Sequence, residues 1–284
     1  AVMNLILDPI AIFVLGWGVT GAAIATAAGQ VVTALLSALY FRKTKTFQLY
    51  PDSFRLHKKT VRSIAELGVS SLVIQLAIVI VMAVANNMIA RYGNDSIYGA
   101  NIPLSAVGIV MKVFAIVIAF AVGIGVGGQP IVGYNFGAGN YRRVKETYRA
   151  MLIAVCIVGV IATLLFELCP QLFISLFGSE SALYNDYAQL CFRIFLGGIL
   201  LTCLQKVNSI FLQAMGRPLQ STLLTLAREV VCFVPALLLL APRVGVVGML
   251  WAAPIADVLS ALLALVLVCS EMRRLTALEQ RAAA

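Results

Sequence analysis

Residues 16–40, GWGVTGAAIATAAGQVVTALLSALY, return in altered form at residues 243–267 as RVGVVGMLWAAPIADVLSALLALVL. The two stretches match in a single register, and a proline, Pro9 or Pro235, precedes each of them. The matching positions are Gly18 and Gly245, Gly21 and Gly248, Ala25 and Ala252, Val31 and Val258, and the triplets Ala34-Leu35-Leu36 and Ala261-Leu262-Leu263. Internal repetition inside apolar segments is typical of membrane transporters built from two related halves. Beyond the apolar segment that directly precedes each copy, four further apolar segments come before the second copy and none before the first, so the repeat is unbalanced.

Composition indicates that a lipid bilayer surrounds most of this chain. Of its 284 residues, 61% are hydrophobic and 12% charged, and the mean hydropathy is +0.98. Soluble domains are about half apolar and about a quarter charged. The apolar runs are unbroken rather than alternating, which favours helices. We therefore predict an all-α integral membrane protein with eight transmembrane helices, over residues 2–16, 18–41, 62–90, 102–128, 147–169, 187–212, 219–241 and 245–270.

Charge placement predicts how the chain is threaded through the membrane. The formal net charge is +9, and Lys and Arg gather in alternate connections between the expected helices. Those connections hold Arg42, Lys43, Lys45, Arg55, Lys58, Lys59 and Arg62; Arg142, Arg143, Lys145 and Arg149; Arg217; and Arg273, Arg274 and Arg281. Basic loops stay in the cytoplasm. We therefore expect both chain ends to be cytoplasmic, and we attribute the positive charge to membrane topology rather than to nucleic-acid binding.

Several sequence patterns exclude other kinds of site. The six cysteines lie in or beside apolar runs, and the single histidine, His57, stands in a basic connection, so no metal site and no cofactor are expected. Residues 123–128 match GxGxxG, but the pattern ends an apolar run and lacks the strand–helix context of a dinucleotide site. Small residues four apart predict close helix packing instead, at Gly123 and Gly127 and at Gly133 and Gly137.

Ionisable groups within apolar runs are the candidate functional residues. Such a group costs roughly 2.5–3.5 kcal/mol near the bilayer centre, so it usually has a role or a partner. The candidates are Asp8, Glu66, Lys112, Arg193, Lys206, Arg228, Glu229 and Asp257. Glu66, Lys206, Arg228 and Glu229 lie near the expected helix ends, and we interpret them as side chains that reach the interface. Lys112 and Asp257 stand in mid-run.

Asp8 is the most informative of these residues. Asn4 and Asp8 are four residues apart and share one helix face, and Pro9 removes a backbone donor and bends the helix beside them. A carboxylate, an amide and freed carbonyl groups together suit a proton or a small hard cation. The alternative from these residues alone is a structural helix-end cap.

The chain resembles the multidrug and toxic compound extrusion (MATE) family. The matching stretches are NLILDPI at 4–10, GVTGAAIAT at 18–26, QPIVGYNFGA at 129–138 and QAMGRP at 213–218. The resemblance implies a twelve-helix, two-lobed fold, of which this chain would hold the last two helices of the first lobe (1–41), a cytoplasmic basic linker (42–61), the six-helix second lobe (62–272) and a cytoplasmic tail (273–284). It would then lack about the first four transmembrane helices, and we expect it to be unable to carry out coupled efflux alone.

The resemblance also implies a function. Family members export cationic or amphipathic compounds in exchange for H⁺ or Na⁺ by alternating access, as monomers in the bilayer. For this chain it implies a bacterial inner-membrane antiporter and an ion-coupling site of Asp8, Asn4 and Thr26, with Pro9 at the helix bend. Residues 68–80 hold Gln75 and no carboxylate, so a second-lobe ion site of the kind some relatives use is not expected.

We name Gln75, Asn86, Asn87 and Lys112 as candidate cavity residues that contact the small-molecule substrate, with interhelical hydrogen bonding as the alternative role. One alternative function is a lipid-linked oligosaccharide or polysaccharide flippase of the same superfamily, which a cavity rich in Arg and Lys would favour. The other is a membrane-embedded enzyme, although the apolar runs contain no histidine and no recognised catalytic triad.

Overall fold

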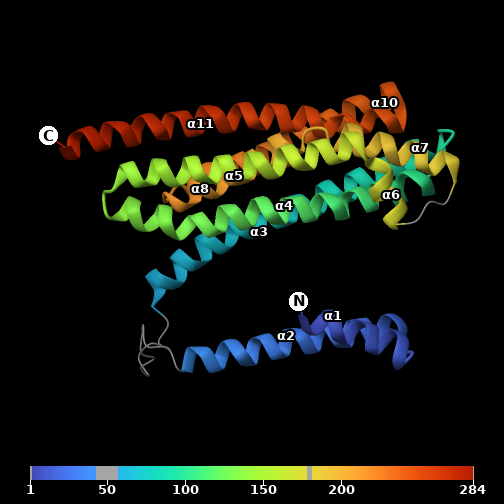
Figure 1. Cartoon of the computed structure of the whole chain (residues 1–284), viewed down its shortest axis with the longest axis horizontal. Coiled ribbons are helices and arrows are strands. Elements are labelled where there is room, and N and C mark those ends of the chain that lie inside the picture. Colours follow the sequence, from blue (N-terminus) through green and yellow to red (C-terminus); the bar gives the residue numbers. More distant parts are fainter. Residues whose placement is uncertain (1, 43–56, 178–180, 284) are drawn as a thin grey trace. The chain divides into compact units, whose positions relative to one another are not determined.

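The computed structural model describes residues 2–42, 57–177 and 181–283, and these residues form helices and connecting turns without a strand (Figure 1). The helices are α1 (Val2–Pro9), α2 (Gly18–Arg42), α3 (Lys58–Asn94), α4 (Asn101–Gly137), α5 (Tyr141–Leu168), α6 (Pro170–Phe177), α7 (Ala182–Leu190), α8 (Ile199–Ala214), α9 (Pro218–Leu226), α10 (Val234–Leu250) and α11 (Ala252–Ala283). Within the described ranges, π-helical segments also occur at η1 (Ile10–Val14), η3 (Cys191–Phe195) and η4 (Ala227–Phe233). The chain forms two compact units, Ala1–Ile64 and Ala65–Ala284.

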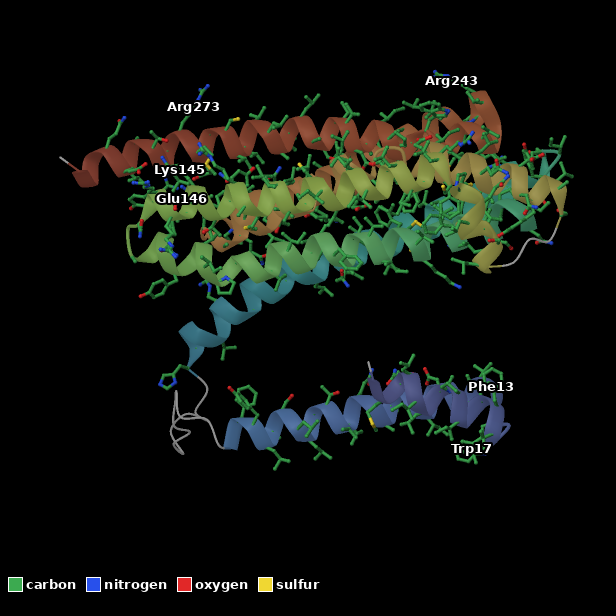
Figure 2. All side chains as sticks on the ribbon, in the orientation of Figure 1. Phe13, Trp17, Lys145, Glu146, Arg243 and Arg273 are labelled. Atoms are coloured by element: carbon green, nitrogen blue, oxygen red, sulfur yellow. The ribbon has the colours of Figure 1, made fainter. Side chains whose placement is uncertain are left out.

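The first unit is a helical hairpin of α1, η1 and α2. Pro9 has no N–H to donate within the helix, and the π-helical segment η1 begins directly after it. The N–H of Trp17 donates to the carbonyl of Ala11 at 3.1 Å, which closes the turn before α2. A Cβ atom placed on Gly21 would lie 2.9 Å from the Ala11 carbonyl oxygen, so glycine allows this close approach. Phe13 and Trp17 project from this turn (Figure 2).

The second unit is built around α8, which packs against α4, α5, α9 and α11. Val207, Phe211 and Leu212 of α8 are fully buried, and they pack with residues such as Val110 and Val144 of the neighbouring helices. Polar residues are buried on the same helix: the hydroxyl of Tyr148 donates to Oδ1 of Asn208 at 2.8 Å. Because every neighbour of α8 belongs to this unit, the unit has its own core.

Ion pairs tie one end of the second unit together. Lys145 at the start of α5, labelled in Figure 2, pairs with Glu279 near the end of α11. The guanidinium Nε of Arg217, in the turn between α8 and α9, lies 3.4 Å from the Glu271 carboxylate of α11. Arg243 lies at the opposite end of the unit (Figure 2).

The two copies of the sequence repeat fold alike. Gly18, in the first copy, is the first residue of α2 and has a φ of +55°. Gly245, in the second copy, lies at a kink inside α10 and has a φ of +71°. Three residues later, a Cβ on Gly21 or Gly248 would collide with the Cβ of the residue four positions earlier. Glycine is thus required twice in each copy, for the left-handed backbone and for the tight turn that follows it.

The all-α membrane architecture is confirmed at the level of six or seven apolar spans. Six helices in the described ranges are long and apolar enough to cross a bilayer, and α7–η3 with α8 forms one more if the pair, bent by 45°, is a single span. The first expected span, 2–16, is a shorter apolar helix, Met3–Val14.

Several predicted boundaries were wrong. Helix α4 continues through Pro130 to Gly137, so the GxGxxG pattern lies inside the helix and does not end it. The expected connection 170–186 contains α6 and the start of α7. Helix α11 runs past residue 270 to Ala283. Two carboxylates in this extension, Glu271 and Glu279, make ion pairs with Arg217 and Lys145. Most of the linker predicted at 42–61 lies outside the described residues.

The predicted close packing at Gly123, Gly127, Gly133 and Gly137 was also wrong for the described residues. A Cβ on Gly123, Gly127 or Gly137 would meet no described atom within 4 Å, and one on Gly133 would make an ordinary contact at 3.6 Å. The tight positions on α4 are Gly125, against Ile210, and Gly128, against Met151. Spacing four apart finds a helix face, but it does not say which face meets a neighbour.

Candidate functional site

A cavity of about 670 Å³ lies within the second unit. Its lining residues come from α3, the first half of α4, α7, η3 and α8, and from the segments between η4 and the start of α11. Figure 1 shows how these elements are arranged. Its wall is mostly aliphatic, aromatic and methionine side chains, among them Ile78, Val81, Met82, Ile89, Leu104, Met111, Phe114, Ile118, Phe195, Phe233, Leu237 and Met249. This volume and lining are typical of sites that hold a drug-sized molecule.

Buried charged residues form one part of the cavity wall. The Nε and Nη2 atoms of Arg228, in η4, each lie 2.8 Å from Oδ1 of Asp257 on α11. Nη2 also lies 3.5 Å from the hydroxyl oxygen of Thr202 on α8. The side chains of Arg228 and Asp257 are only 8% and 2% exposed, so two opposite charges are held together away from solvent. A charged pair is stable at such a position only when its hydrogen bonds are made, as they are here.

Glu229 extends this cluster toward the cavity. Its Oε1 accepts a hydrogen bond from Nη1 of Arg228 at 2.7 Å and lies 3.8 Å from Nζ of Lys206 on α8. We call these four charged residues the charge cluster: Lys206, Arg228, Glu229 and Asp257. Thr202 lies beside the cluster. Gly198 lies directly against the Asp257 carboxylate, where any Cβ would overlap it.

Sequence reasoning missed the charge cluster. The interpretation of Arg228 and Glu229 as side chains at a helix end is wrong, because α9, η4 and α10 form one continuous apolar stretch, Pro218–Leu250, with both residues inside it. Lys206, on α8, lines the cavity. The available signal was the presence of opposite charges, Arg228 and Asp257, inside two apolar runs. Opposite charges inside a membrane usually form an ion pair, because each would otherwise be buried without a partner.

The predicted cavity residues divide into two pairs. Asn86 and Lys112 line the cavity. Gln75 and Asn87 are exposed residues of α3 outside its lining. Their role in substrate binding stays a prediction.

The predicted ion-coupling residues lie in the first unit. Asn4 and Asp8 are one turn apart on α1, and the side-chain oxygen of Asn4 lies against Gly29 of α2. Helices α1 and α2 run antiparallel, since Ala11 contacts Gly21 and Asn4 contacts Gly29. This register brings Asp8 level with Ile24 and Ala25, just before Thr26. Oδ1 of Asp8 is shielded and has no hydrogen-bond partner in the described residues. The hydroxyl of Thr26 donates to the Ala22 carbonyl at 2.9 Å, and Pro9 lies at the junction with η1.

No group of three or more His, Cys, Asp or Glu side chains in the described ranges is arranged to hold a metal ion.

A bundle of membrane-spanning helices around a cavity of the size that holds a small molecule defines a polytopic membrane protein of the transporter class. A family model described as MatE matches residues 71–238. The chain belongs to the MATE family of transporters, and such proteins are not enzymes.

Curated relatives and solved structures agree with this assignment. The chain is 26% identical over 275 residues to multidrug export protein MepA of Staphylococcus haemolyticus (strain JCSC1435) and to MepA of Staphylococcus aureus (strain bovine RF122 / ET3-1). Each alignment covers 96% of this chain and 59% of the relative. A solved structure of a multidrug resistance MATE family transporter of the MOP superfamily, in an outward-facing conformation, superposes with a TM-score of 0.84. It is 21% identical and is covered over 61% of its length, with 97% of this chain aligned. The chain thus spans about three fifths of the relatives it matches.

Proposed function

We propose that the protein is a secondary active exporter of amphipathic small molecules, driven by inward movement of H⁺ or Na⁺ and working by alternating access. The observation that carries the proposal is the 670 Å³ cavity among membrane-spanning helices, with an apolar wall and a few polar groups. The relatives named above are multidrug exporters, which supports the same cargo class. Cargo would occupy this cavity in one of the two access states.

For ion coupling, we propose Asp8 as the ion-binding residue, with Asn4 and Thr26 as further ligands and Pro9 as the bend. The shielded, unpartnered Oδ1 of Asp8 supports this role, because such an oxygen lacks only a proton or a cation. Thr26 already donates its hydroxyl hydrogen to Ala22, and its oxygen lone pairs stay available to a cation.

The proposed topology places both chain ends in the cytoplasm of a bacterial cell, with the protein in the inner membrane as a monomer. Lys145 and Arg273 lie at the end of the second unit opposite Arg243 (Figure 2), and the connections at their end hold more basic residues. We propose that Met3–Val14 is the eighth span, that residues 1–41 and 62–272 belong to the first and second lobes, and that 42–61 and 273–284 are cytoplasmic.

Ion-driven export from vesicles tests the coupling proposal. The protein, expressed from its complete reading frame, would be reconstituted and loaded with a fluorescent amphipathic compound, and an H⁺ or Na⁺ gradient would then be imposed. We expect Asp8→Asn to abolish the gradient-dependent component, because an amide neither releases a proton nor balances a cation's charge. Asp95→Asn, at an exposed turn after α3, is the matched control and should export normally. Gradient-driven export by Asp8→Asn at the unsubstituted rate would exclude Asp8 as the coupling residue.

A lipid-linked saccharide flippase is the second candidate. Lys112, Lys206 and Arg228 line the cavity, and cations on a cavity wall suit a lipid phosphate. A lipid phosphate that binds in the cavity more tightly than soluble amphipathic molecules would favour this candidate.

A further inference from the structure

Positive charge outweighs negative charge on the wall of the cavity. Three cationic side chains line it, Lys112, Lys206 and Arg228. Among the described residues, Glu229 is the one carboxylate in that lining. The cavity therefore differs from the acidic site that a cationic cargo would require for charge pairing.

The contacts show which of these cations are already neutralised. Arg228 is held by Asp257 behind the wall and by Glu229 in it, at 2.8 and 2.7 Å, so its charge is balanced. Glu229 is therefore shared between Arg228 and Lys206. Lys112 has no carboxylate within 4 Å in the described part of the chain. The three cations of the lining thus face two carboxylates, Glu229 and Asp257, and the site keeps one unbalanced positive charge.

Hydrogen-bond donors in the lining are also unfilled. The distance of 3.8 Å between Nζ of Lys206 and Oε1 of Glu229 is too long for a hydrogen bond, so the ammonium group has donors to spare. Tyr187 is completely buried and lines the cavity, and its hydroxyl lies beside the thiol of Cys191. Unfilled donors next to an excess positive charge are the features that bind an oxyanion.

We propose that this cavity binds an amphipathic organic anion, whose carboxylate, sulfonate or phosphate group contacts Lys112 and Lys206 while its hydrocarbon part packs on the apolar wall. The inference deepens the proposed export function by naming the cargo class, and it rests on that function only for the step of transport. A cationic head group would find a single carboxylate, Glu229, already bonded to Arg228 at 2.7 Å.

Equilibrium binding to the purified chain in neutral phosphatidylcholine nanodiscs tests the proposal. The probes are a naphthyl-alkyl carboxylate and the naphthyl-alkyl trimethylammonium compound of equal chain length. We expect the carboxylate to bind at least about tenfold more tightly than the cation, and Lys112→Gln and Lys206→Gln each to weaken its binding by about tenfold, the loss of one charge-assisted hydrogen bond. Lys112→Arg should retain binding, because it keeps the charge and the donors.

Controls separate this effect from general charge and from misfolding. Arg243→Gln removes an exposed cation outside the lining and should leave the binding of both probes unchanged. Folding of each variant is checked by its circular dichroism and thermal melting. Tighter binding of the trimethylammonium probe, or unchanged carboxylate binding in a folded Lys112→Gln/Lys206→Gln variant, would overturn the proposal.

A third probe distinguishes two sources of the anion. If farnesyl phosphate binds more tightly than the naphthyl-alkyl carboxylate and loses affinity in the same variants, the anion is a lipid phosphate. If the carboxylate binds more tightly, the anion is a soluble amphipathic acid. Because binding is measured without an ion gradient, failure of gradient-driven export would reject the transport function and leave the anion site standing.

Discussion

Breaking the Arg228–Asp257 pair is expected to destabilise the second unit strongly. The two side chains are 8% and 2% exposed and are joined by two contacts of 2.8 Å, so both charges are largely removed from solvent. Removing one partner of a buried pair costs about 3–5 kcal/mol, because the other charge is left unpaired. The loss of stability in Asp257→Leu should be near the lower value, since Arg228 keeps its hydrogen bond to Glu229. Arg228→Met should fall near the upper value, since it leaves both Asp257 and Glu229 without that partner.

The double variant Arg228→Met/Asp257→Leu should recover most of this loss. Replacing a buried ion pair with apolar side chains of similar size is often neutral or stabilising, so we expect a free energy of unfolding within about 2 kcal/mol of the unsubstituted chain. The coupling energy from this double-mutant cycle should then reach several kcal/mol. Reversible unfolding in mixed micelles, followed by circular dichroism as the denaturing detergent fraction rises, measures all four variants.

An exposed ion pair supplies the matched control cycle. Arg142 and Glu146 are 81% and 57% exposed and lie four residues apart on α5, 3.0 Å from each other. Such helix pairs contribute about 0.3–0.5 kcal/mol. If the coupling between Arg228 and Asp257 were as small as this, the pair would be solvated, and the reasoning about a buried charge cluster would fail.

Three further substitutions test the packing of the second unit by thermal melting. Gly245→Ala should cost about 1 kcal/mol or more, because an alanine at a φ of +71° is strained; an unchanged Tm would contradict the left-handed turn. Tyr148→Phe should cost about 1–3 kcal/mol, because it leaves the buried Asn208 oxygen unpaired. A cost below about 0.5 kcal/mol would mean that water replaces the hydroxyl. Gly159→Val should cost about 1–3 kcal/mol, because even a Cβ would lie 3.1 Å from the Leu200 backbone; normal stability would mean the two helices separate freely.

The sequence repeat marks two glycines with a left-handed backbone, because this geometry is local. It did not predict that α10 continues past Gly245 to Leu250. Gly18 and Gly245 stand where the backbone must be left-handed, and apolar length alone defines the helices that follow. A π-helical segment begins directly after Pro9, since the missing N–H acts within one helical turn, while a bend of the helix there stays a prediction.

The charge cluster was not readable in the same way. Depth in the membrane depends on where a helix begins, and α9, η4 and α10 continue through the residues that looked like an end. Partnership between Arg228 and Asp257 depends on packing between η4 and α11, which apolar patterning does not specify. Of the asparagines, Asn86 lines the cavity and Asn87 does not, because neighbouring residues point about 100° apart on a helix.

Gln75 shows how position along a helix matters as well as direction. It lies on nearly the same helical stripe as Asn86, eleven residues earlier, which is about 16 Å along the axis. The lining of α3 begins at Ile78, so Gln75 falls just beyond it. Sequence spacing thus predicted the face and missed the extent of the cavity.

Filling the cavity tests most directly the claim that it is the cargo site. Gly108 on α4 lines the cavity, and a Cβ placed there would meet no described atom within 4 Å, so Gly108→Trp projects an indole into the space that cargo would occupy. Gly123→Trp is the control on the same helix, with equally open surroundings and no place in the lining. Binding of the naphthyl-alkyl carboxylate in nanodiscs should weaken at least about tenfold in Gly108→Trp, since a steric clash costs about 1–3 kcal/mol, and should be unchanged in Gly123→Trp. Equal affinities in the two variants would show that cargo binds elsewhere.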